Sequence, residues 1–580
     1  MRNLSSSVAA ATLLLGLASI GSSAPISGAK AQTSGTTTQQ AYRFLAQASF
    51  GARPADIKHL VSDLNFSYSA WLNEQIANPI QFSYATISQG LPCSVAQSQT
   101  ISTATKNTVT AICPTDVSQT FWLGAVFDNN QLRQRVAFAL SQILVISVDD
   151  GSLGAWGDAS AAYEDTLYRD AFVNFRVLLN DISNSDAMGK FLSFLYNVQG
   201  TPPTATSPGT VPDQNFAREV MQLFTIGLVQ LDSSGEPILD PKTGQPIPTY
   251  SQNDVVGASN VMTGFGPYDD PKDIAWDFKY NGSLYGRENY QFRPTNSYSQ
   301  YHSTIPKSFL GVTIPAQKTA DPVGDLNTFL DTLFNHPNVG PFVGKQLIQR
   351  LVTSNPSPAY VSRVAAVFNN NGAGVRGDLS AVVKAILLDP EARSDSSITS
   401  PSFGKLREPI LRMAQLLRVL GGATGADGTF GFAPYDPTQQ LGQYPFRAGS
   451  VFNFYYPNFT PPLSALAAND LVSPEMQITT TETVYRLDQF LAPIFSQAGW
   501  YVNGATPGYA FTLDYYDWLP YLESGTLVDQ LNLVFMSGQM STTLKNDLLA
   551  AIKATIGGPQ PQLAQALRIL FDSPEYIVQK

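Results

Sequence analysis

The sequence is poor in the residues that bind metal ions. It contains only two cysteines and three histidines in 580 residues. Zinc fingers, iron–sulfur clusters and centres built from several histidines need more ligands of these types. The sequence therefore argues against those metal centres, and we expect neither a bound metal nor an organic cofactor.

Basic residues are also few. Lys and Arg number 35 against 45 Asp and Glu, which gives a formal net charge of −10. Proteins that bind nucleic acids do so mainly through basic patches that contact the phosphate backbone. An acidic chain of this kind is not expected to have a nucleic acid as its partner.

Long apolar runs are lacking as well. A helix that crosses a membrane needs about 18 consecutive apolar residues. The longest run after the N-terminus, residues 136–148, is too short and is interrupted by Ser141 and Gln142. We therefore predict no membrane span.

The N-terminus has the composition of an export signal. Arg2 provides a positive charge, residues 8–20 form a short apolar run, and Ala29 and Ala31 form a small-x-small cleavage site. Cleavage of the signal peptide is expected after Ala31 and leaves a flexible N-terminus, residues 32–40. The signal predicts a periplasmic or secreted protein.

The two cysteines, Cys93 and Cys113, lie in a Ser/Thr-rich segment, residues 83–120, that is expected to be a loop. In an oxidising compartment such a pair is typical of one disulfide. Closing the loop between them would contribute about 3 kcal/mol to stability. Two free thiols are the alternative. A catalytic thiolate is not expected, because the residues between the cysteines offer only Lys106 as a base.

Helical periodicity dominates the rest of the chain. In residues 131–147, apolar side chains recur on one face, as in a buried helix. Similar patterns recur to the C-terminus. Helices are predicted, among other places, for residues 131–147, 161–180, 215–227, 326–335 and 405–420.

One strand signal interrupts the helices. In residues 229–250, two clusters of turn residues separate apolar pairs, which predicts a hairpin-like insertion. We therefore expect a mainly α protein. It consists of a large single helical domain, residues 41–580, with a small β-hairpin insertion and long aromatic loops.

Two glycine-rich stretches resemble nucleotide-binding loops. Residues 372–377 match G-x-G-x-x-G, but a dinucleotide fingerprint must follow a strand, and here a predicted helix precedes it. A helix end followed by an N-cap at Asp378 explains the same residues. Residues 340–345 are one residue too short for a P-loop, and Gln346 replaces the Ser or Thr that would hold magnesium.

The predicted helix 215–227 places a carboxylate in an apolar face. The stripe consists of Phe216, Val220, Leu223 and Phe224. Glu219 lies three residues after the first of them and four before the third, so its side chain points into the stripe. An unpaired buried charge costs several kcal/mol, so Glu219 must be paired, protonated or functional. It is a candidate catalytic residue, and a buried Glu–Arg bridge between helices is the alternative.

Two further charged residues lie near Glu219 in the sequence. Arg218, on the flank of the same helix, could clamp an anionic substrate group or another acid. Asp254 begins the next helix in the pattern Ser251-x-x-Asp254, which is a capping box. Asp254 is a candidate catalytic residue, with N-terminal capping as the competing interpretation.

His302 lies in a polar stretch, residues 301–307, that lacks the pattern of a core helix. With Lys307 five residues later, it is a candidate general acid or base. A hydrogen bond within a loop is the alternative role for His302.

Aromatic residues are dense in three segments, residues 250–301, 444–459 and 500–521. They are mixed with Asn, Gln, Asp and Gly. Such segments can line a carbohydrate groove, or they can pack as loops over a helical core.

Several segments together resemble a known family. They are Ala41-Tyr-Arg-Phe-Leu-Ala-Gln-Ala-Ser-Phe-Gly51, Gln131-Leu-Arg-Gln-Arg-Val136, Asn215-Phe-Ala-Arg-Glu219 with Leu223-Phe-Thr-Ile-Gly227, Asp254 ahead of Thr263-Gly264, Lys307-Ser-Phe-Leu-Gly311, the run 345–355, Lys405-Leu-Arg-Glu-Pro409, Ser450-Val-Phe-Asn-Phe454 and Ser573-Pro-Glu-Tyr576. In this order, over residues 41–580, they resemble the family called domain of unknown function 1800.

The resemblance implies an exported bacterial protein. It also implies a candidate partner, a second secreted protein of the alkaline-phosphatase-like type. The chain departs from the family at two places. Gln222 stands where the family often has Glu, and Ser303, after His302, stands where it often has Asp. A two-acid site that needs those groups would be missing from this chain.

Two classes of function remain. In the first, the protein is an enzyme, a hydrolase or lyase, that acts on an envelope or extracellular polysaccharide by carboxylate acid/base chemistry. Its catalytic residues would be Glu219, His302 and Asp254, and its substrate-binding residues Arg218, Lys307 and Arg133. In the second, the protein is a non-catalytic scaffold or the assembly partner of another exported protein. A shared solvent-reachable pocket would favour the enzyme, and a closed bridge around Glu219 would favour the scaffold.

Overall fold

The protein is described here by a computed structural model. It describes residues 37–90, 112–154, 156–202, 204–206, 208–267, 294–422, 441–496, 512–513 and 516–580. Within these residues the chain is mainly helical, with four two-stranded antiparallel sheets. The predicted mainly α fold is therefore confirmed. The predicted signal peptide and Cys93 lie outside the described residues.

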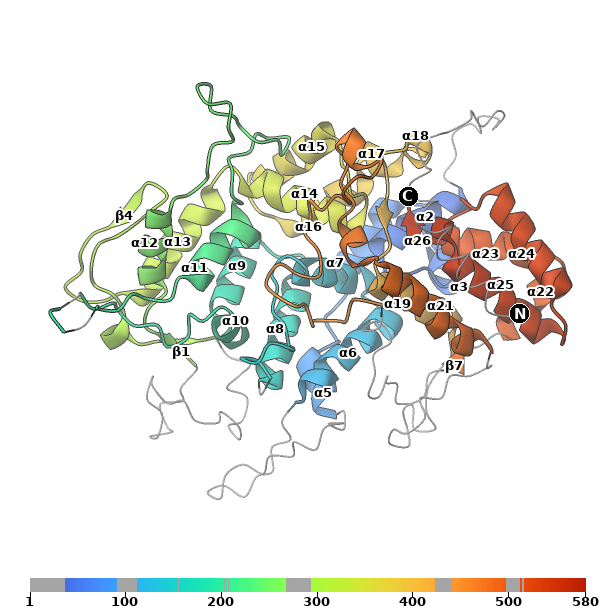
Figure 1. Ribbon diagram of the computed structural model, residues 1–580, viewed down its shortest axis with the longest axis horizontal. Helices are drawn as coiled ribbons and strands as arrows, with labels where there is room; N and C mark the ends of the chain where they lie inside the picture. The colour runs from blue at the N-terminus through green and yellow to red at the C-terminus, as the bar shows by residue number, and fades with distance from the viewer. Residues whose placement is uncertain are drawn as a thin grey trace, which may run out of the picture.

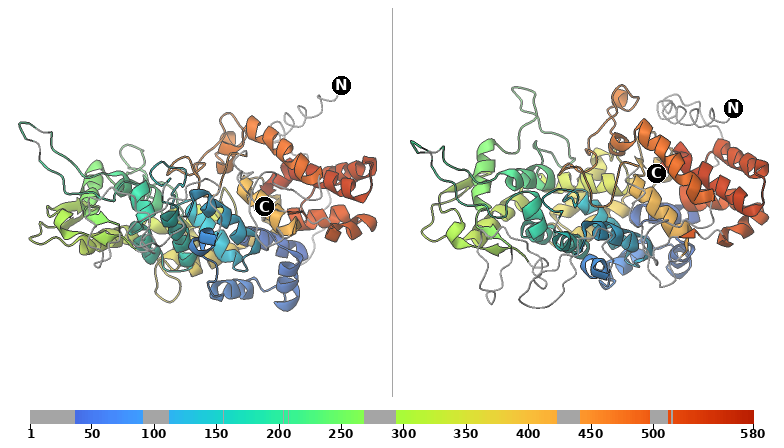
Figure 2. Two further views of the ribbon diagram at one scale, coloured as in Figure 1. Left: turned by 90° about the horizontal axis from the view of Figure 1, so that it is seen from below. Right: turned by 60° about the horizontal axis from the view of Figure 1, so that its bottom comes forward.

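The molecule is elongated, and its helices are distributed along the long axis (Figures 1 and 2). The first part of the chain forms α2 (Thr38–Ala48), α3 (Pro54–Lys58), the π-helix η2 (His59–Asp63), α4 (Tyr68–Ala77), α5 (Tyr84–Gly90), α6 (Pro114–Phe127), α7 (Gln131–Ser141), α8 (Gly157–Asp170), α9 (Phe175–Ser183) and α10 (Asp186–Phe191).

The next part builds one end of the molecule (Figure 1). It contains α11 (Asn215–Glu219), the π-helix η3 (Val220–Thr225), α12 (Gln252–Val261), β1 (Phe265–Gly266), β2 (Asn296–Ser297), η5 (Ser299–Tyr301), β3 (Lys307–Phe309), β4 (Val312–Ile314) and α13 (Pro322–Asn335). Strand β1 pairs with β2, and β3 pairs with β4.

The chain then returns through the middle and forms the opposite end. The middle contains α14 (Val339–Leu351), α15 (Pro358–Asn369), α16 (Leu379–Leu388), α17 (Pro390–Arg393), α18 (Asp395–Thr399), β5 (Lys405–Leu406), α19 (Pro409–Leu420) and β6 (Gly421–Gly422). The last part contains η6 (Ala467–Asn469), η7 (Pro474–Ile478), α21 (Thr481–Ser496), β7 (Thr512–Leu513), η8 (Tyr516–Trp518), α22 (Leu519–Glu523), α23 (Leu527–Met536), α24 (Thr542–Ala554), α25 (Pro559–Asp572), α26 (Pro574–Ile577) and β8 (Val578–Gln579).

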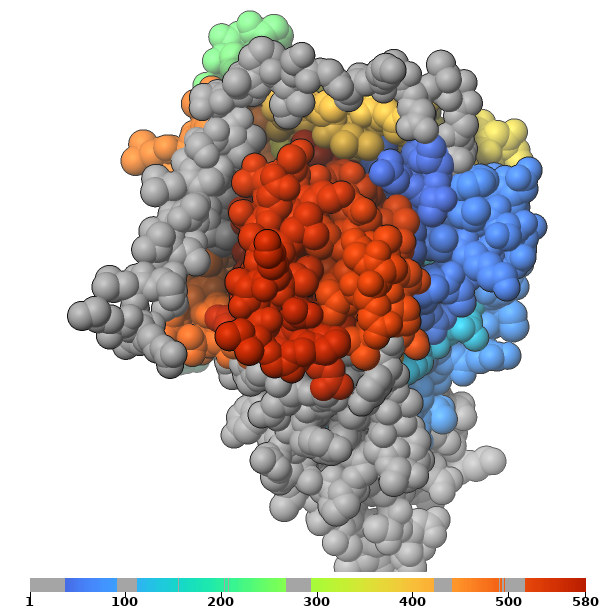
Figure 3. Space-filling model, turned by 90° about the vertical axis from the view of Figure 1, so that its right-hand side faces the viewer, coloured from blue at the N-terminus to red at the C-terminus, as the bar shows by residue number. Residues whose placement is uncertain are grey.

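The two ends of the described chain meet. Strand β8 pairs with β5, and α23 packs against α2. Figure 3 shows the C-terminal helices in red directly beside the N-terminal helices in blue. The C-terminal helices therefore pack against the N-terminal ones as part of one structure.

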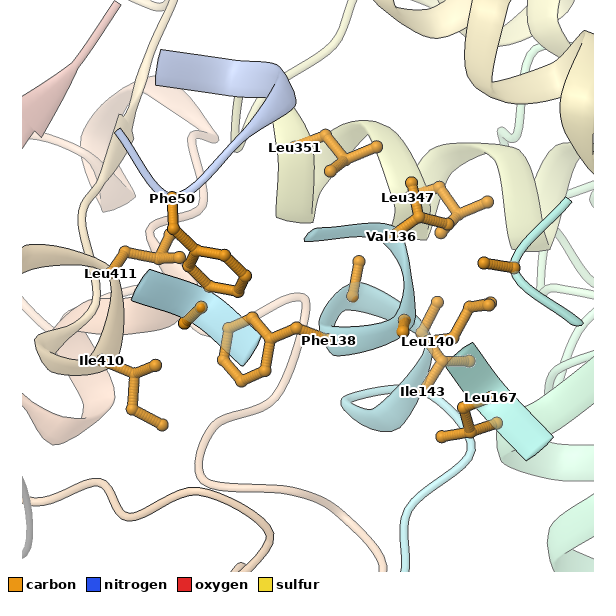
Figure 4. Packing of buried hydrophobic residues seen from close by; sticks show 14 of the residues in the cluster. Phe50, Val136, Phe138, Leu140, Ile143, Leu167, Leu347, Leu351, Ile410 and Leu411 are labelled. Carbon is orange, nitrogen blue, oxygen red and sulfur yellow. The ribbon is translucent and has the colours of Figure 1, made fainter. Parts of the chain in front are cut away.

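Helix α7 lies at the centre of the hydrophobic core (Figure 4). Val136 faces Leu347 of α14, and Phe138 faces Phe50 and Ile410. All five side chains are buried. The apolar face predicted for this helix thus packs against helices from both halves of the chain.

The helix predicted over residues 131–147 ends earlier, at Ser141. The hydroxyl of Ser141 donates to the carbonyl of Phe138, and the carbonyl of Gln142 accepts from Nη2 of Arg350 at 2.9 Å. Val148 then donates its N–H to the carbonyl of Phe446. Contacts with residues distant in the sequence thus replace the helical bonds that would continue α7.

Two other predicted helices also differ from the structure. Residues 405–420 begin as strand β5, and helix α19 starts only at Pro409, because proline lacks an N–H and disfavours a helical residue before it. Residues 161–180 are split, since Asn174 accepts a hydrogen bond from the backbone of Arg176 and caps a new helix, α9.

The insertion at residues 229–250 has the predicted hairpin character. Isolated bridges join Val229 to Pro248, Leu231 to Pro237 and Leu239 to Pro246. The carboxylates of Asp232 and Asp240 accept backbone N–H groups within the two turns. Asp378 is the N-cap of α16, as the capping interpretation of residues 372–378 predicts. The segment 83–120, expected to be a loop, contains α5 and the start of α6.

No helix in the described ranges combines the length and the hydropathy needed to cross a membrane.

Candidate functional site

Glu219 is the last residue of α11 and is followed directly by the π-helix η3. Phe216, Ala217, Val220 and Met221 are buried, and Glu219 itself is only 6% exposed. Single π-helical turns inside α-helices are rare and occur frequently at functional sites. The carboxyl group therefore lies at an irregular turn within an apolar helix.

The carboxyl of Glu219 is incompletely paired. Its Oε2 atom is buried and has no hydrogen-bond partner among the described residues. Burial raises the pKa of Glu219, and the nearby charge of Arg218 offsets only part of this effect. Glu219 thus has the raised pKa and the free oxygen of a carboxyl that could exchange a proton with a ligand.

Arg218 and Tyr250, both half-buried, interact electrostatically with Glu219. Nη2 of Arg218 donates to Oε1 of Gln252 at 3.1 Å, and the hydroxyl of Tyr250 donates to Oε1 of Gln222 at 2.9 Å. Burial raises the pKa of Tyr250, Arg218 lowers it and Glu219 raises it further. The pKa of the Tyr250 phenol thus responds to the charges of both Arg218 and Glu219.

Asp254 lies in the first turn of α12 and caps it. Its Oδ2 accepts from the backbone N–H and the hydroxyl of Ser251, and its Oδ1 accepts from the N–H of Leu310 at 2.7 Å. Burial raises the pKa of Asp254, but the hydrogen bonds from Ser251 and Leu310 outweigh it and leave the pKa below its ordinary value. Both carboxylate oxygens therefore hold backbone structure, at the start of α12 and in the β3–β4 turn.

His302 and Lys307 meet on a third residue, Asp325. Nε2 of His302 lies 2.9 Å from Oδ2 of Asp325, and Nζ of Lys307 lies 2.7 Å from the same oxygen. Nδ1 of His302 lies 2.7 Å from the carbonyl oxygen of Thr263. Both ring nitrogens of His302 therefore contact oxygen atoms of the protein.

The group of His302, Lys307 and Asp325 is closed to solvent. The side chains of His302 and Lys307 are 0% exposed, and that of Asp325 is 4% exposed. The other oxygen of Asp325 accepts from Gln317 at 2.7 Å. Burial raises the pKa of Asp325, but the hydrogen bonds from His302 and Lys307 outweigh it and leave the pKa below its ordinary value.

Asp325 is the member of this group that sequence reasoning missed. The predicted helix began only at residue 326, whereas α13 starts at Pro322, with Asp321 as its N-cap. On the longer helix Asp325 shares a face with Phe329 and Leu333. The same argument that selected Glu219, an acid on an apolar face, could have selected Asp325.

Arg133 belongs to a different region. Its Nη1 donates to the carbonyls of Tyr168 and Arg169, and its guanidinium lies 4.6 Å from the centre of the Phe172 ring. Nη2 donates to the carbonyl of Ile76. Arg133 thus ties α7 to α4 and to the end of α8.

Cys113 is the N-cap of α6 and is buried. It takes part in a disulfide. Its predicted partner, Cys93, lies outside the described residues, so the pairing of the two stays a prediction.

The predicted site residues therefore fall into separate groups. Glu219 lies beside Arg218, His302 and Lys307 share Asp325, and Asp254 and Arg133 hold the backbone. In the described part of the chain, no group of three or more His, Cys, Asp or Glu side chains is arranged to hold a metal ion.

Comparisons with known proteins place the chain in a family. Neither the curated proteins nor the solved structures yielded a match. The family model described as "Protein of unknown function (DUF1800)" matches residues 43–578, nearly the whole chain. The protein is therefore a member of the DUF1800 family.

Proposed function

We propose that the protein is an exported enzyme that acts on an envelope or extracellular polysaccharide, with Glu219 as its general acid. The observation that carries this proposal is the carboxyl of Glu219. It is buried, its pKa is raised, and its Oε2 has no partner among the described residues. A general acid needs a pKa above that of an ordinary carboxyl so that it still holds its proton near neutral pH.

Arg218 is the proposed binding group for an anionic part of the polymer. It is half-buried next to Glu219, and its Nη2 bonds to the exposed side chain of Gln252. A substrate carboxylate could replace that amide at little cost, because a charged acceptor binds a guanidinium more strongly than a neutral one. Tyr250 would add a hydroxyl donor beside it.

An exposed aromatic pair supports a carbohydrate as the substrate class. Phe452 and Tyr456 are exposed, and the centres of their rings are 5.4 Å apart. Such rings offer flat apolar surfaces with which sugar rings can pack. Most of the two other aromatic segments lies outside the described residues.

His302 and Lys307 have a supporting role in this proposal. Because their side chains are fully buried and already paired with Asp325, they would hold β3 against α13 rather than touch the polymer. Asp254 and Arg133 likewise would position backbone. The catalytic chemistry would then rest on Glu219 and its neighbours on α11 and α12.

The second candidate function is that of a non-catalytic scaffold or assembly partner of another exported protein. The observation in its favour is that four of the six predicted site residues serve the fold. In that case Glu219 would also be structural, and the partner would bind elsewhere on the surface.

Glu219→Gln separates the two candidates, because it keeps the shape of the side chain and removes its acid. For an enzyme, we expect the release of reducing ends from purified polysaccharides to fall about 100-fold or more, with little change in melting temperature. The matched control is Glu236→Gln, an exposed acid on the hairpin insertion. A loss of about 3–5 kcal/mol in stability would instead indicate a structural ion pair. A wild-type protein that cleaves none of a broad panel of polysaccharides would refute the enzyme.

Export has its own test. The mature protein recovered from outside the inner membrane is expected to begin at Gln32. Amino-terminal sequencing that finds Met1, or recovery only from the cytosol, would contradict the export signal.

A further inference from the structure

A second cluster of charged side chains lies in the middle of the molecule, away from Glu219. It brings together Arg135 of α7, Arg350 of α14, Lys405 of β5, Glu408 before α19 and Glu475 of η7. All five are buried. Several of the segments that carry the family resemblance, residues 131–136, 345–355 and 405–409, thus converge here.

The cluster is organised around one carbonyl group. The carbonyl oxygen of Arg350 accepts from Nη2 of Arg135 at 2.6 Å and from Nζ of Lys405 at 2.9 Å. Lys405 also pairs with Glu475 at 3.0 Å. The cations of Arg135 and Lys405, from two distant segments, therefore meet on one backbone oxygen of a third.

Glu408 is held in the cluster through one of its two carboxylate oxygens. Its Oε2 accepts from Nε2 of Gln142 at 2.6 Å, from the hydroxyl of Tyr455 at 2.8 Å and from Nε2 of Gln443. These bonds occupy one carboxylate oxygen of Glu408 and leave the other free.

Several polar atoms of the cluster are buried without partners among the described residues. The donors are Nε and Nη1 of Arg135 and Nε of Arg350, and the acceptors are Oε1 of Glu408 and Oε2 of Glu475. Buried polar groups in proteins are nearly always hydrogen-bonded, and a buried guanidinium with free N–H groups is costly. The cluster therefore has the donors and acceptors of a binding site for a small polar group.

The charges of the cluster indicate whether the bound group would be an anion or a cation. Three cations face two acids, and burial raises the pKa of Glu475 despite the nearby charge of Lys405. Burial also lowers the pKa of Arg135 to about 10, as is expected for a cation with too little compensating negative charge. An anion would supply the missing charge.

An irregular segment covers the cluster. Residues 446–473 contain only the short helix η6, and the hydroxyl of Tyr455 fastens them to Glu408. Asn355 binds both the N–H and the carbonyl of Val472. Long segments with little secondary structure are uncommon in compact domains and are often functional.

We propose that this cluster binds one free phosphate ion beneath residues 446–473. The N–H groups of Arg135 and Arg350 would bind its oxygens. Phosphate near neutral pH also carries a proton, which it can donate to the free oxygen of Glu408 or Glu475. Sulfate carries no such proton, so its oxygens would be repelled by the free carboxylate oxygens of Glu408 and Glu475. The two acids therefore favour phosphate over sulfate. The burial of all five side chains favours a free ion over a phosphate ester.

The test uses the full mature protein, dialysed free of phosphate. Isothermal titration with inorganic phosphate is expected to show one saturable site, and phosphate is expected to raise the melting temperature. Sulfate should bind at least about 100-fold more weakly, because a site built for a hydroxyl donor rejects an analogue that lacks it. Glycerol 3-phosphate is the phosphate ester used for comparison, and it should bind more weakly than the free phosphate ion.

Two variants test the assignment of residues. Arg135→Gln should abolish phosphate binding, while Arg486→Gln, an exposed arginine paired with Glu482, should leave it unchanged. Glu475→Gln should reduce the preference for phosphate over sulfate at least several-fold, because an amide can donate to sulfate. A purely structural acid would not change that ratio, so this variant is decisive if Arg135→Gln fails to fold.

Three outcomes would overturn the proposal. They are no saturable binding of phosphate to the wild type, equal binding of phosphate and sulfate, and unchanged binding in a folded Arg135→Gln protein. The last two would mean an adventitious ion only. Tighter binding of the ester than of the free ion would refute the closed site as well.

Discussion

Nζ of Lys307 and Oδ2 of Asp325 lie 2.7 Å apart, with 0% and 4% of their side chains exposed. A buried ion pair of this kind adds little stability compared with apolar residues, but it is costly to break, because the remaining charge is left unpaired in the interior. Here a histidine shares the same carboxylate oxygen. Asp325 of α13 is therefore one of the residues that hold this helix against β3, together with Phe329, whose ring contacts that of Phe309.

Asp325→Asn is expected to destabilise the protein by about 3–5 kcal/mol, because it leaves Lys307 and His302 without their shared anion. Chemical denaturation of the variant beside the wild type measures this. The control on the same helix is Asp331→Asn, whose carboxylate is 60% exposed in its pair with Arg176 and should cost less than about 1 kcal/mol. Equal effects of the two variants would contradict the importance of the buried pair.

The same variant has an expected pH dependence. Because the pKa of Asp325 lies below its ordinary value in the folded protein, its contribution is present above the unfolded pKa of about 3.9 and is lost as pH falls further. The stability difference between wild type and Asp325→Asn should therefore shrink below about pH 4. A difference that stays constant down to pH 2 would contradict this assignment.

Asp116→Asn is expected to change stability in the opposite direction: it should stabilise the protein. Burial raises the pKa of Asp116 from 3.8 to about 7, so its ionisation opposes folding as pH rises from about 4 to 7. Asparagine can still accept the N–H of Cys113 and removes the charge. The variant should gain up to about 4 kcal/mol over the wild type at pH 8 and nothing at pH 4. Melting curves at several pH values, with the exposed Asp529→Asn as control, measure the effect.

Gly257→Ala should be strongly destabilising. A Cβ atom on Gly257 would lie 1.8 Å from the carbonyl oxygen of Ser308, so α12 and β3 would have to move apart. We expect a loss of about 3 kcal/mol or more in stability, or no soluble protein. Gly151→Ala is the matched control, since its Cβ would meet no atom within 4 Å. A Gly257→Ala protein as stable as this control would show that α12 and β3 do not approach so closely.

The disulfide prediction can be tested without an assay for function. The chain has two cysteines, so an internal disulfide must join Cys93 and Cys113. Thiol titration of the unfolded, unreduced protein should find no free thiol and, after reduction, two. Reduction should cost about 3 kcal/mol of stability. Two reactive thiols before reduction would contradict the bridge.

Local signals in the sequence determine much of the fold. The start of α15 follows from its N-cap Ser357 and from Pro358 in its first turn. Helix α16 begins directly after its predicted N-cap, Asp378. Caps and helical periodicity act between residues a few positions apart, so they can be predicted from the sequence alone. The apolar face of α7 and the acid on the apolar face of α11 are determined in the same way.

Only the tertiary structure decides which distant residues meet. No local pattern in the sequence predicts that Asp325 contacts His302. Likewise, no residue near Gln142 in the sequence predicts that Arg350 donates a hydrogen bond to the carbonyl of Gln142, where α7 ends. Arg133 and Arg135 stand two residues apart on one helix, yet the first binds backbone near α8 while the second enters the buried cluster beside Arg350. Such contacts depend on how whole helices pack, because a buried polar group takes its partner from whatever segment the packing brings within reach.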